Sequence, residues 1–282
     1  MKSVRYDSIS NTSSRTYIYD ADYDIQTGDF FYLGKFFSSG TKYFVLRMSK
    51  EANNIWMNTF TDTAVYKSLE YSPTYEIVYH TLSVSSKFTL IRTNSTDGTF
   101  LESYQINSSV RQIDYFNLCS LSADESSFLC LGLASTQAVI KFDASNLSFH
   151  VVYYPSGYTS SRHLDIIAIS SDEVFFSMAQ SRTYHLIKAS FNTSNNVYTE
   201  SSHQSLSTGS YSDSFKAVAD EAGDTIWIGF ESSDYTVEYS QYNLTDFSLI
   251  GSRYSINDDR SYTTRLNDMG ISNQTVFIMF FS

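Results

Sequence analysis

Seven asparagines stand in the triplet Asn-x-Ser/Thr, the acceptor sequence for N-linked glycans, in which a sugar is joined to the asparagine amide nitrogen. They are Asn11, Asn94, Asn107, Asn146, Asn192, Asn243 and Asn273. In a chain rich in Ser and Thr the number of triplets alone is weak evidence. The alternative is that each asparagine serves a tight turn, where its side chain bonds the backbone. The hydroxyl residue two positions later favours glycosylation.

Three carboxylates at alternate positions, Asp20, Asp22 and Asp24, form a weak candidate for a calcium site. Hard cations bind several oxygen ligands within one turn, but the glycine and the closing glutamate of a calcium-binding loop are lacking here. Because alternate residues of a strand share one face, a solvated acidic edge explains the pattern as well. No zinc-ligand spacing occurs among the histidines, which are His80, His150, His163, His185 and His203.

Cys119 and Cys130 bracket a turn and lie about opposite each other on adjacent expected strands. This spacing allows a cross-strand disulfide, and the alternative is a pair of buried thiols that pack as small apolar groups. Motifs for catalysis or cofactors are missing, including the nucleophile turn Gly-x-Ser-x-Gly and the glycine-rich phosphate and dinucleotide loops. The sequence therefore predicts neither an enzyme nor a cofactor.

These candidates are carried by an internal repeat of roughly fifty residues. A short apolar segment recurs after a polar turn at 30–34, 75–79, 128–132, 174–178, 226–230 and 276–280. The residues that precede these segments are spaced by 45, 53, 46, 52 and 50 positions. Such nearly all-apolar runs are typical of inner strands covered on both faces.

One strand-like segment precedes each apolar segment and two follow it, with polarity increasing along the unit. A propeller blade has this profile, because its first strands are packed inside and its last strand lies at the rim. We therefore predict an all-β fold, one β-propeller over residues 1–282 with about six four-stranded blades, or seven. The expected blades are 15–60, 61–106, 107–154, 155–203, 204–255 and 256–282 with 1–10.

The last expected blade is incomplete, because the sequence ends directly after its apolar segment. Residues 4–10 are a candidate for its outermost strand, which leaves one strand lacking. The blade is then three-stranded, or the chain is a fragment, or a neighbouring copy lends the strand. An unpaired apolar edge invites such addition.

Four of the sequons recur at a similar place in the repeat. Asn94, Asn146, Asn192 and Asn243 each lie 18 to 20 residues beyond the residue that precedes their own unit's apolar segment. This places them in the turn between the third and fourth strands. Glycans there would leave the opposite end, with the turns between second and third strands, free for a partner.

The first unit permits a comparison with a known family. Residues 24–34, 43–48 and 55–60 contain Asp-x-x-x-Gly-Asp-x-x-Tyr-x-Gly, Phe-Val-Leu-Arg and Ile-Trp-x-x-x-Phe. This combination resembles the SBBP-type β-propeller repeat. The resemblance implies an extracellular or surface-associated binding or scaffold repeat, and no catalytic residues are carried over from it.

Composition excludes some classes of partner. The net charge is −11 and the 19 basic residues are scattered, whereas a nucleic-acid binder clusters Lys and Arg to displace counterions. No apolar run approaches the roughly 20 residues of a membrane-spanning helix, and no signal peptide is visible.

The expected function is a non-enzymatic extracellular or cell-surface glycoprotein, a structural or protein-interaction module. Its expected partners are copies of itself or other surface proteins, together with N-linked glycans. The alternatives are a carbohydrate-binding lectin, a propeller-type hydrolase or lyase, and a cytoplasmic location if the sequons are unoccupied.

Overall fold

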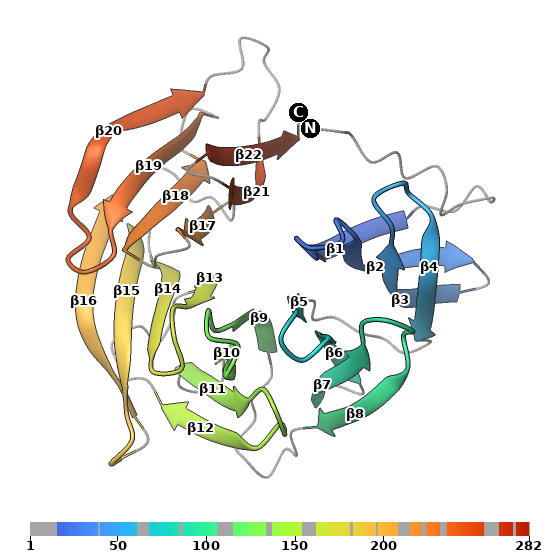
Figure 1. The fold of residues 1–282 in the computed structure, drawn as a ribbon. Coiled ribbons are helices and arrows are strands. Elements are labelled where there is room, and N and C mark those ends of the chain that lie inside the picture. Colours follow the sequence, from blue (N-terminus) through green and yellow to red (C-terminus); the bar gives the residue numbers. More distant parts are fainter. Residues whose placement is uncertain are drawn as a thin grey trace. The chain divides into compact units, whose positions relative to one another are not determined.

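The computed structural model describes a protein built from β-strands (Figure 1). The described residues are 16–38, 40–60, 68–84, 87–105, 115–133, 137–153, 162–180, 183–195, 197–207, 215–220, 224–231, 236–256, 265–272 and 275–281. The strands group in fours along the chain. The first two groups are β1 (Thr16–Tyr23), β2 (Phe30–Ser38), β3 (Gly40–Met48) and β4 (Asn54–Phe60), then β5 (Leu69–Ser72), β6 (Ile77–Val84), β7 (Lys87–Asn94) and β8 (Phe100–Gln105).

The later groups follow the same plan (Figure 1). The third is β9 (Tyr115–Leu121), β10 (Ser127–Leu133), β11 (Gln137–Asp143) and β12 (Phe149–Tyr153). The fourth is β13 (Arg162–Ala168), β14 (Glu173–Gln180), β15 (Thr183–Asn192) and β16 (Val197–Ser207). The last strands are β17 (Phe215–Ala219), β18 (Thr225–Glu231), β19 (Val237–Asn243), β20 (Leu249–Ile256), β21 (Arg265–Ser272) and β22 (Thr275–Phe281).

Within each group the strands pair in sequence order and the pairs with a described register are antiparallel, so each group is a meander. The recurring apolar segments form the second strands β2, β6, β10, β14, β18 and β22, which confirms the all-β fold with repeating four-stranded units. β21 and β22 form a two-stranded sheet, and residues 4–10, expected to complete it, lie outside the described residues.

The third and fourth groups are joined into one eight-stranded sheet, which the repeat did not predict. The outer strand β12 pairs in parallel with the outer strand β16 at Tyr153 and Val197. β16 also runs to Ser207, past the expected limit of the fourth unit at 203. The β15–β16 hairpin is long because its pairing continues to Thr183 opposite Ser207.

The chain forms two compact units. In the unit that contains the first two groups, Phe31 and Leu33 of β2 pack with Val78 and Leu82 of β6. Tyr32 on the opposite face of β2 is also buried, beside Leu46 of β3. Covering both faces explains why this strand is apolar without alternation.

In the other unit, Phe175 of β14 and Leu186 of β15 pack with Ile226 and Ile228 of β18. A smaller cluster joins the fifth group to the last two strands through Val237 and Met269. In both units the main core therefore lies between the faces of two successive sheets.

First strands carry a recurring irregularity next to an aspartate. The pairing register shifts before Asp20 in β1, before Asp165 in β13 and before Asp268 in β21. The Asp20 carboxylate accepts the Leu69 N–H at 2.7 Å, and the Asp165 carboxylate accepts the Ala217 N–H at 2.7 Å. A bulge re-aims a side chain, and here the carboxylate reaches the first strand of the next group.

Candidate functional site

The turns after β7, β11 and β19 share a six-residue geometry, which we call the outer turn, whereas the turn after β3 is one residue shorter and is closed from Ser49 to Asn53. In an outer turn the first N–H donates to the sixth carbonyl, from Asn94 to Thr99 at 2.9 Å and from Asn243 to Ser248 at 2.9 Å. The fifth residue is in the left-handed region, with φ of 75° at Gly98 and 56° at Phe247. A residue in this region reverses the chain within the turn.

Three sequon asparagines occupy the first position of an outer turn or its counterpart. The carboxamide Oδ1 of Asn94, Asn192 and Asn243 accepts the N–H two residues later, at 2.8, 2.9 and 2.7 Å respectively. This is the Asx-turn bond that was the alternative explanation for these asparagines. It engages the oxygen of the carboxamide, whereas a glycan is attached through the nitrogen. The two roles are therefore compatible.

The fourth of these sequons has a different place in the turn. The outer turn after β11 begins at Asp143, whose N–H donates to the Ser148 carbonyl at 2.8 Å. Asn146 is therefore at the fourth position, where the other turns have Asp97 and Asp246. All four sequons thus lie in turns between third and fourth strands, as predicted, but Asn146 stands at the fourth position of its turn and not at the first. Counting from the apolar segment cannot separate the first and fourth positions, since both carry Asn or Asp.

The fourth position has its own backbone bond. The carboxylates of Asp97 and Asp246 accept the N–H groups of Thr99 and Ser248, at 2.8 and 2.9 Å. These bonds lower the pKa of both carboxyl groups. Asn146 is exposed on the same turn surface. Asn11, Asn107 and Asn273 lie outside the described residues.

The outer-turn geometry also occurs between β1 and β2, at residues 24–29. Asp24 is its first residue and accepts the Gln26 N–H at 2.9 Å and the Thr27 hydroxyl at 2.8 Å. Partial burial opposes ionisation of Asp24, but these hydrogen bonds prevail and lower its pKa. Asp24 therefore serves the turn.

The other two calcium candidates bind the backbone of the next sheet. Asp20 and Asp22 lie on one face of β1, and their carboxylates accept the N–H groups of Leu69 and Tyr71, each at 2.7 Å. Burial raises the pKa of Asp22, although the Tyr71 and Tyr23 N–H groups act in the opposite direction. Among the described residues, no group of three or more His, Cys, Asp or Glu side chains is placed to hold a metal ion.

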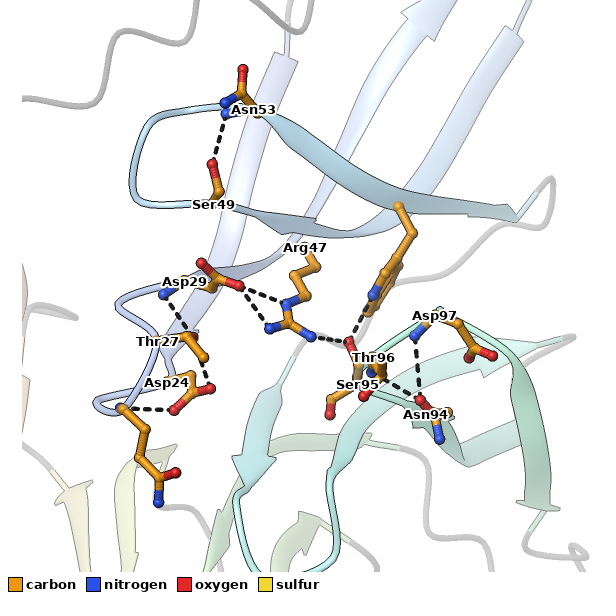
Figure 2. Close-up of polar contacts among 12 residues, drawn as sticks. Asp24, Thr27, Asp29, Arg47, Ser49, Asn53, Asn94, Ser95, Thr96 and Asp97 are labelled. Carbon is orange, nitrogen blue, oxygen red and sulfur yellow. Dashed lines mark hydrogen bonds and ion pairs between the residues drawn. The ribbon is translucent and has the colours of Figure 1, made fainter.

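Arg47 of β3 connects two turns of successive sheets (Figure 2). Its Nε and Nη2 donate to the Asp29 carboxylate at 3.0 and 2.7 Å, and its Nη1 donates to the Ser95 carbonyl at 2.8 Å. Trp56 Nε1 donates to the same carbonyl at 2.8 Å. Since both charged side chains are largely buried, this network fixes the sequon-bearing turn at residues 94–99 against the first sheet.

Equivalent basic residues make similar contacts elsewhere. Arg92 of β7 donates to the Ser145 carbonyl at 2.9 Å, and Lys141 of β11 pairs with Asp172 at 3.1 Å. No role was predicted for these residues, although the signal was present, because a basic residue stands near the end of four of the third strands, at Arg47, Arg92, Lys141 and Lys188.

The two cysteines are joined as a disulfide, so neither is a free thiol.

Two histidines of the fourth group are also close together, His185 of β15 and His203 of β16. Nδ1 of His185 lies 3.0 Å from Nε2 of His203. Their spacing along the chain is 18 residues, which matches no local metal motif. The pairing of β15 with β16 makes them diagonal neighbours, because His185 is opposite Ser205 and Ile187 is opposite His203.

The fourth strands expose apolar side chains. Ile55 and Met57 of β4, Phe100 and Leu101 of β8, and Leu249, Ile250 and Tyr254 of β20 are all exposed. Adjacent residues such as Phe100 and Leu101 point to opposite faces of a strand. Both faces are therefore uncovered at these positions, and β4, β8 and β20 are the terminal strands of their sheets.

A second exposed cluster surrounds Lys35 at the opposite end of the first sheet, beside the β2–β3 turn. The ammonium group of Lys35 lies 5.0 Å from the ring centre of Tyr17 and 5.4 Å from those of Tyr19 and Phe37. A hydrogen bond with Tyr19 raises the pKa of Lys35. The rings of Tyr17 and Phe37 are exposed.

No family model matches the chain, and no curated protein matches it. Solved structures do match. The WD40 repeats of RRP9 have a TM-score of 0.61 at 8% identity, covering 91% of this chain and 72% of that one. The β-propeller domain of the trilobed protease from Pyrococcus furiosus has a TM-score of 0.58 at 12% identity, covering 95% and 79%.

The similar structures also include a protein named as an enzyme. A putative 6-phosphogluconolactonase from Bacteroides fragilis has a TM-score of 0.58 at 8% identity, covering 85% of this chain and 84% of that one. Among the described residues, no helix is long and apolar enough to span a membrane. At such low identities these likenesses define the fold alone. The specific resemblance to SBBP-type repeats stays a prediction, and the chain has the β-propeller fold.

Proposed function

We propose that this chain is a non-enzymatic interaction module of the cell surface or extracellular space, a glycoprotein that binds proteins, including copies of itself, through its fourth strands. The observation that carries this proposal is the row of exposed apolar side chains on terminal strands. Such residues on an uncapped strand edge mark surfaces that bind another chain. Soluble chains usually protect these edges with charge, proline or bulges.

The chain itself provides a precedent for pairing between outer strands. β12 and β16 belong to different four-stranded groups and pair in parallel at Tyr153 and Val197. Edge-to-edge contact of this kind satisfies backbone groups that a terminal strand leaves open. β4, β8 and β20 have the same place in their groups, which favours a second copy as their partner.

Two further observations support passage through an oxidising, glycosylating compartment. Asn94, Asn192 and Asn243 lie in turns with their Oδ1 engaged, and among the described residues their Nδ2 atoms have no hydrogen bond. The Cys119–Cys130 disulfide is typical of secreted chains.

Sedimentation velocity across a range of protein concentrations tests the self-association. We expect the wild-type mass to rise with concentration, and Ile250→Lys on β20 to weaken association at least tenfold. Ser252→Lys, which adds the same charge to an exposed position of the same strand, is the matched control. A wild type that stays monomeric, or equal losses in both variants, would refute pairing through β20.

Mass spectrometry of protein secreted from eukaryotic cells tests the glycosylation. We expect peptides with Asn94, Asn146, Asn192 and Asn243 to carry glycans removed by peptide N-glycosidase. Reduction should add two hydrogens to the deglycosylated chain, at Cys119 and Cys130. If all four asparagines are unmodified, the glycoprotein part of the proposal is wrong and the cytoplasmic alternative gains support.

A lectin is the second candidate, and the Lys35 cluster is the observation that favours it. Exposed Tyr and Phe rings stack on the apolar faces of sugars, and a nearby ammonium donates hydrogen bonds to hydroxyl groups. The cluster also lies at the end of its sheet opposite the outer turns. A glycan array with no hits for the wild type would remove this candidate. Binding abolished by Tyr17→Ala, with Tyr254→Ala as control, would favour it.

A further inference from the structure

The histidine pair of the fourth group lies on a regular hairpin. His185 is opposite Ser205, and Ile187 is opposite His203, in the pairing of β15 with β16. His185 and His203 are therefore diagonal neighbours on one face of the sheet, a relation within reach of large side chains. Their ring centres are 5.2 Å apart.

Three atoms that could bind a metal ion lie close together, one each from His185, His203 and Ser205. His185 Nδ1 and His203 Nε2 are 3.0 Å apart, and Ser205 Oγ is 3.3 Å from the first and 3.4 Å from the second. Two ligands on a tetrahedral ion with bonds of about 2.0–2.1 Å are about 3.3 Å from each other. The three atoms thus have the spacing of one face of a coordination tetrahedron.

A carboxylate orients one of the rings. Glu200 Oε1 lies 3.6 Å from His203 Nδ1, the nitrogen that faces away from the pair. A carboxylate on that side favours the tautomer with the proton on Nδ1, which leaves the lone pair of Nε2 for a metal.

We propose that His185 and His203 bind a borderline transition-metal ion such as Zn²⁺, with Ser205 as a weaker oxygen ligand and Glu200 as the residue that positions His203. Imidazole nitrogen suits Zn²⁺, Ni²⁺ and Cu²⁺, whereas Mg²⁺ and Ca²⁺ prefer oxygen ligands. The remaining coordination position is open to water, because the side chain of His203 is partly exposed.

Calorimetric titration of the full chain with Zn²⁺ tests the site. We expect one Zn²⁺ per chain, and at least a thirtyfold loss of affinity in His203→Gln. Glu200→Gln should lose about tenfold, the effect of removing a carboxylate behind a ligating histidine. Thr199→Gln, at an exposed position of the same strand, is the control and should bind as the wild type does, while Mg²⁺ should not compete.

The decisive variant is His203→Gln, because the partly exposed side chain of His203 can be replaced without opening a cavity, and circular dichroism checks that the variant remains folded. Zn²⁺ binding that is unchanged in both His185→Gln and His203→Gln would overturn the proposal. A wild type that binds Zn²⁺ no more tightly than the His185→Gln/His203→Gln double variant would overturn it too.

Discussion

The second and fourth strands of one group lie two strands apart in the same sheet, yet their surroundings are opposite. In the fifth group, β18 has buried positions on both faces, whereas every residue of β20 before Ile256 is exposed. β18 contains Ile226, Ile228 and Phe230, all within the core. β20 exposes Leu249, Ile250 and Tyr254.

This difference separates two kinds of constraint on an apolar side chain. On a second strand, packing between neighbouring sheets determines it, and its loss opens a cavity. On a fourth strand, an apolar side chain gains little from the fold, because much of its surface remains in water. Apolar residues that recur there are better explained by binding than by stability, and the following predictions test this contrast.

The largest expected effect compares two phenylalanines. Phe175→Ala on β14 removes a fully buried ring and should cost about 3–5 kcal/mol of unfolding free energy. Phe100→Ala on β8 removes a ring that is 58% exposed and should change stability by less than about 0.5 kcal/mol. Urea unfolding followed by tryptophan fluorescence measures both. Equal losses would mean that the outer strand is as tightly packed as the inner one.

A second contrast concerns two arginines. Arg47→Ala leaves the buried Asp29 carboxylate without its partner, so we expect a loss of about 3 kcal/mol. Arg253→Ala on the exposed strand β20 should cost less than about 0.5 kcal/mol. Arg47→Lys keeps the charge but cannot reach Asp29 and the Ser95 carbonyl together, so its loss should be intermediate. If the Ala and Lys variants lose the same amount, the forked geometry is not what stabilises this contact.

The repeat and its second strands could be predicted from the sequence, because burial on both faces selects runs such as Ile226-Trp227-Ile228 without polar interruption. The outer turns could also be placed by counting from those runs. Their internal register could not, since Asn and Asp serve both the first and the fourth positions, as Asn94 and Asn146 show. Short-range polar bonds decide that register.

The contacts between successive four-stranded groups could not be predicted from the sequence either. In the next group along the chain, Asp20, Arg47 and Arg92 each contact a backbone group, and a backbone carbonyl or N–H has no residue type to recognise. The His185–His203 pair depends on a diagonal relation across a hairpin with a register shift between Lys188 and Ala189. A search for fixed ligand spacings does not find such a pair.

A third prediction uses pH to examine the inner region. His80 of β6 is fully buried, its Nε2 lies 3.2 Å from Thr93 Oγ1, and burial lowers its pKa to about 3. Below pH 6.5 His80 becomes protonated in the unfolded protein but stays neutral in the folded protein. The free energy of unfolding therefore falls as the pH decreases from 6.5 toward 3. At pH 4.5 the wild type should have lost about 2–3 kcal/mol through this group.

The variant His80→Leu isolates that contribution. When the unfolding free energy is plotted against pH between pH 7 and pH 4.5, the wild type should have the steeper slope. The variant has no histidine at position 80, so it lacks the loss of stability caused by protonation of that residue in the unfolded state. Carboxyl groups titrate alike in both proteins and cancel in the difference. Parallel curves would show that His80 becomes protonated in the folded protein within this range.

The smallest effects separate two reasons for a glycine. Gly34 of β2 has a φ that any residue can adopt, but there is no room for a side chain. An added Cβ would lie 2.5 Å from the Tyr17 carbonyl oxygen and 2.6 Å from the Phe44 ring. Gly34→Ala should therefore cost about 1–3 kcal/mol through overpacking. In Gly251 of β20 a Cβ meets nothing within 4 Å, but φ is +76°. Gly251→Ala should cost about 1 kcal/mol through backbone strain alone.

Asparagine distinguishes the two causes, because it tolerates the left-handed region better than alanine but is larger. We expect Gly251→Asn to recover part of the loss seen in Gly251→Ala, and Gly34→Asn to be worse than Gly34→Ala. Thermal unfolding of the four variants gives this order directly. If Asn is worse than Ala at both positions, then space also limits position 251, and the outer strand is more closely covered than its exposure indicates. The contrast between inner and outer strands would then apply to side-chain burial but not to backbone packing.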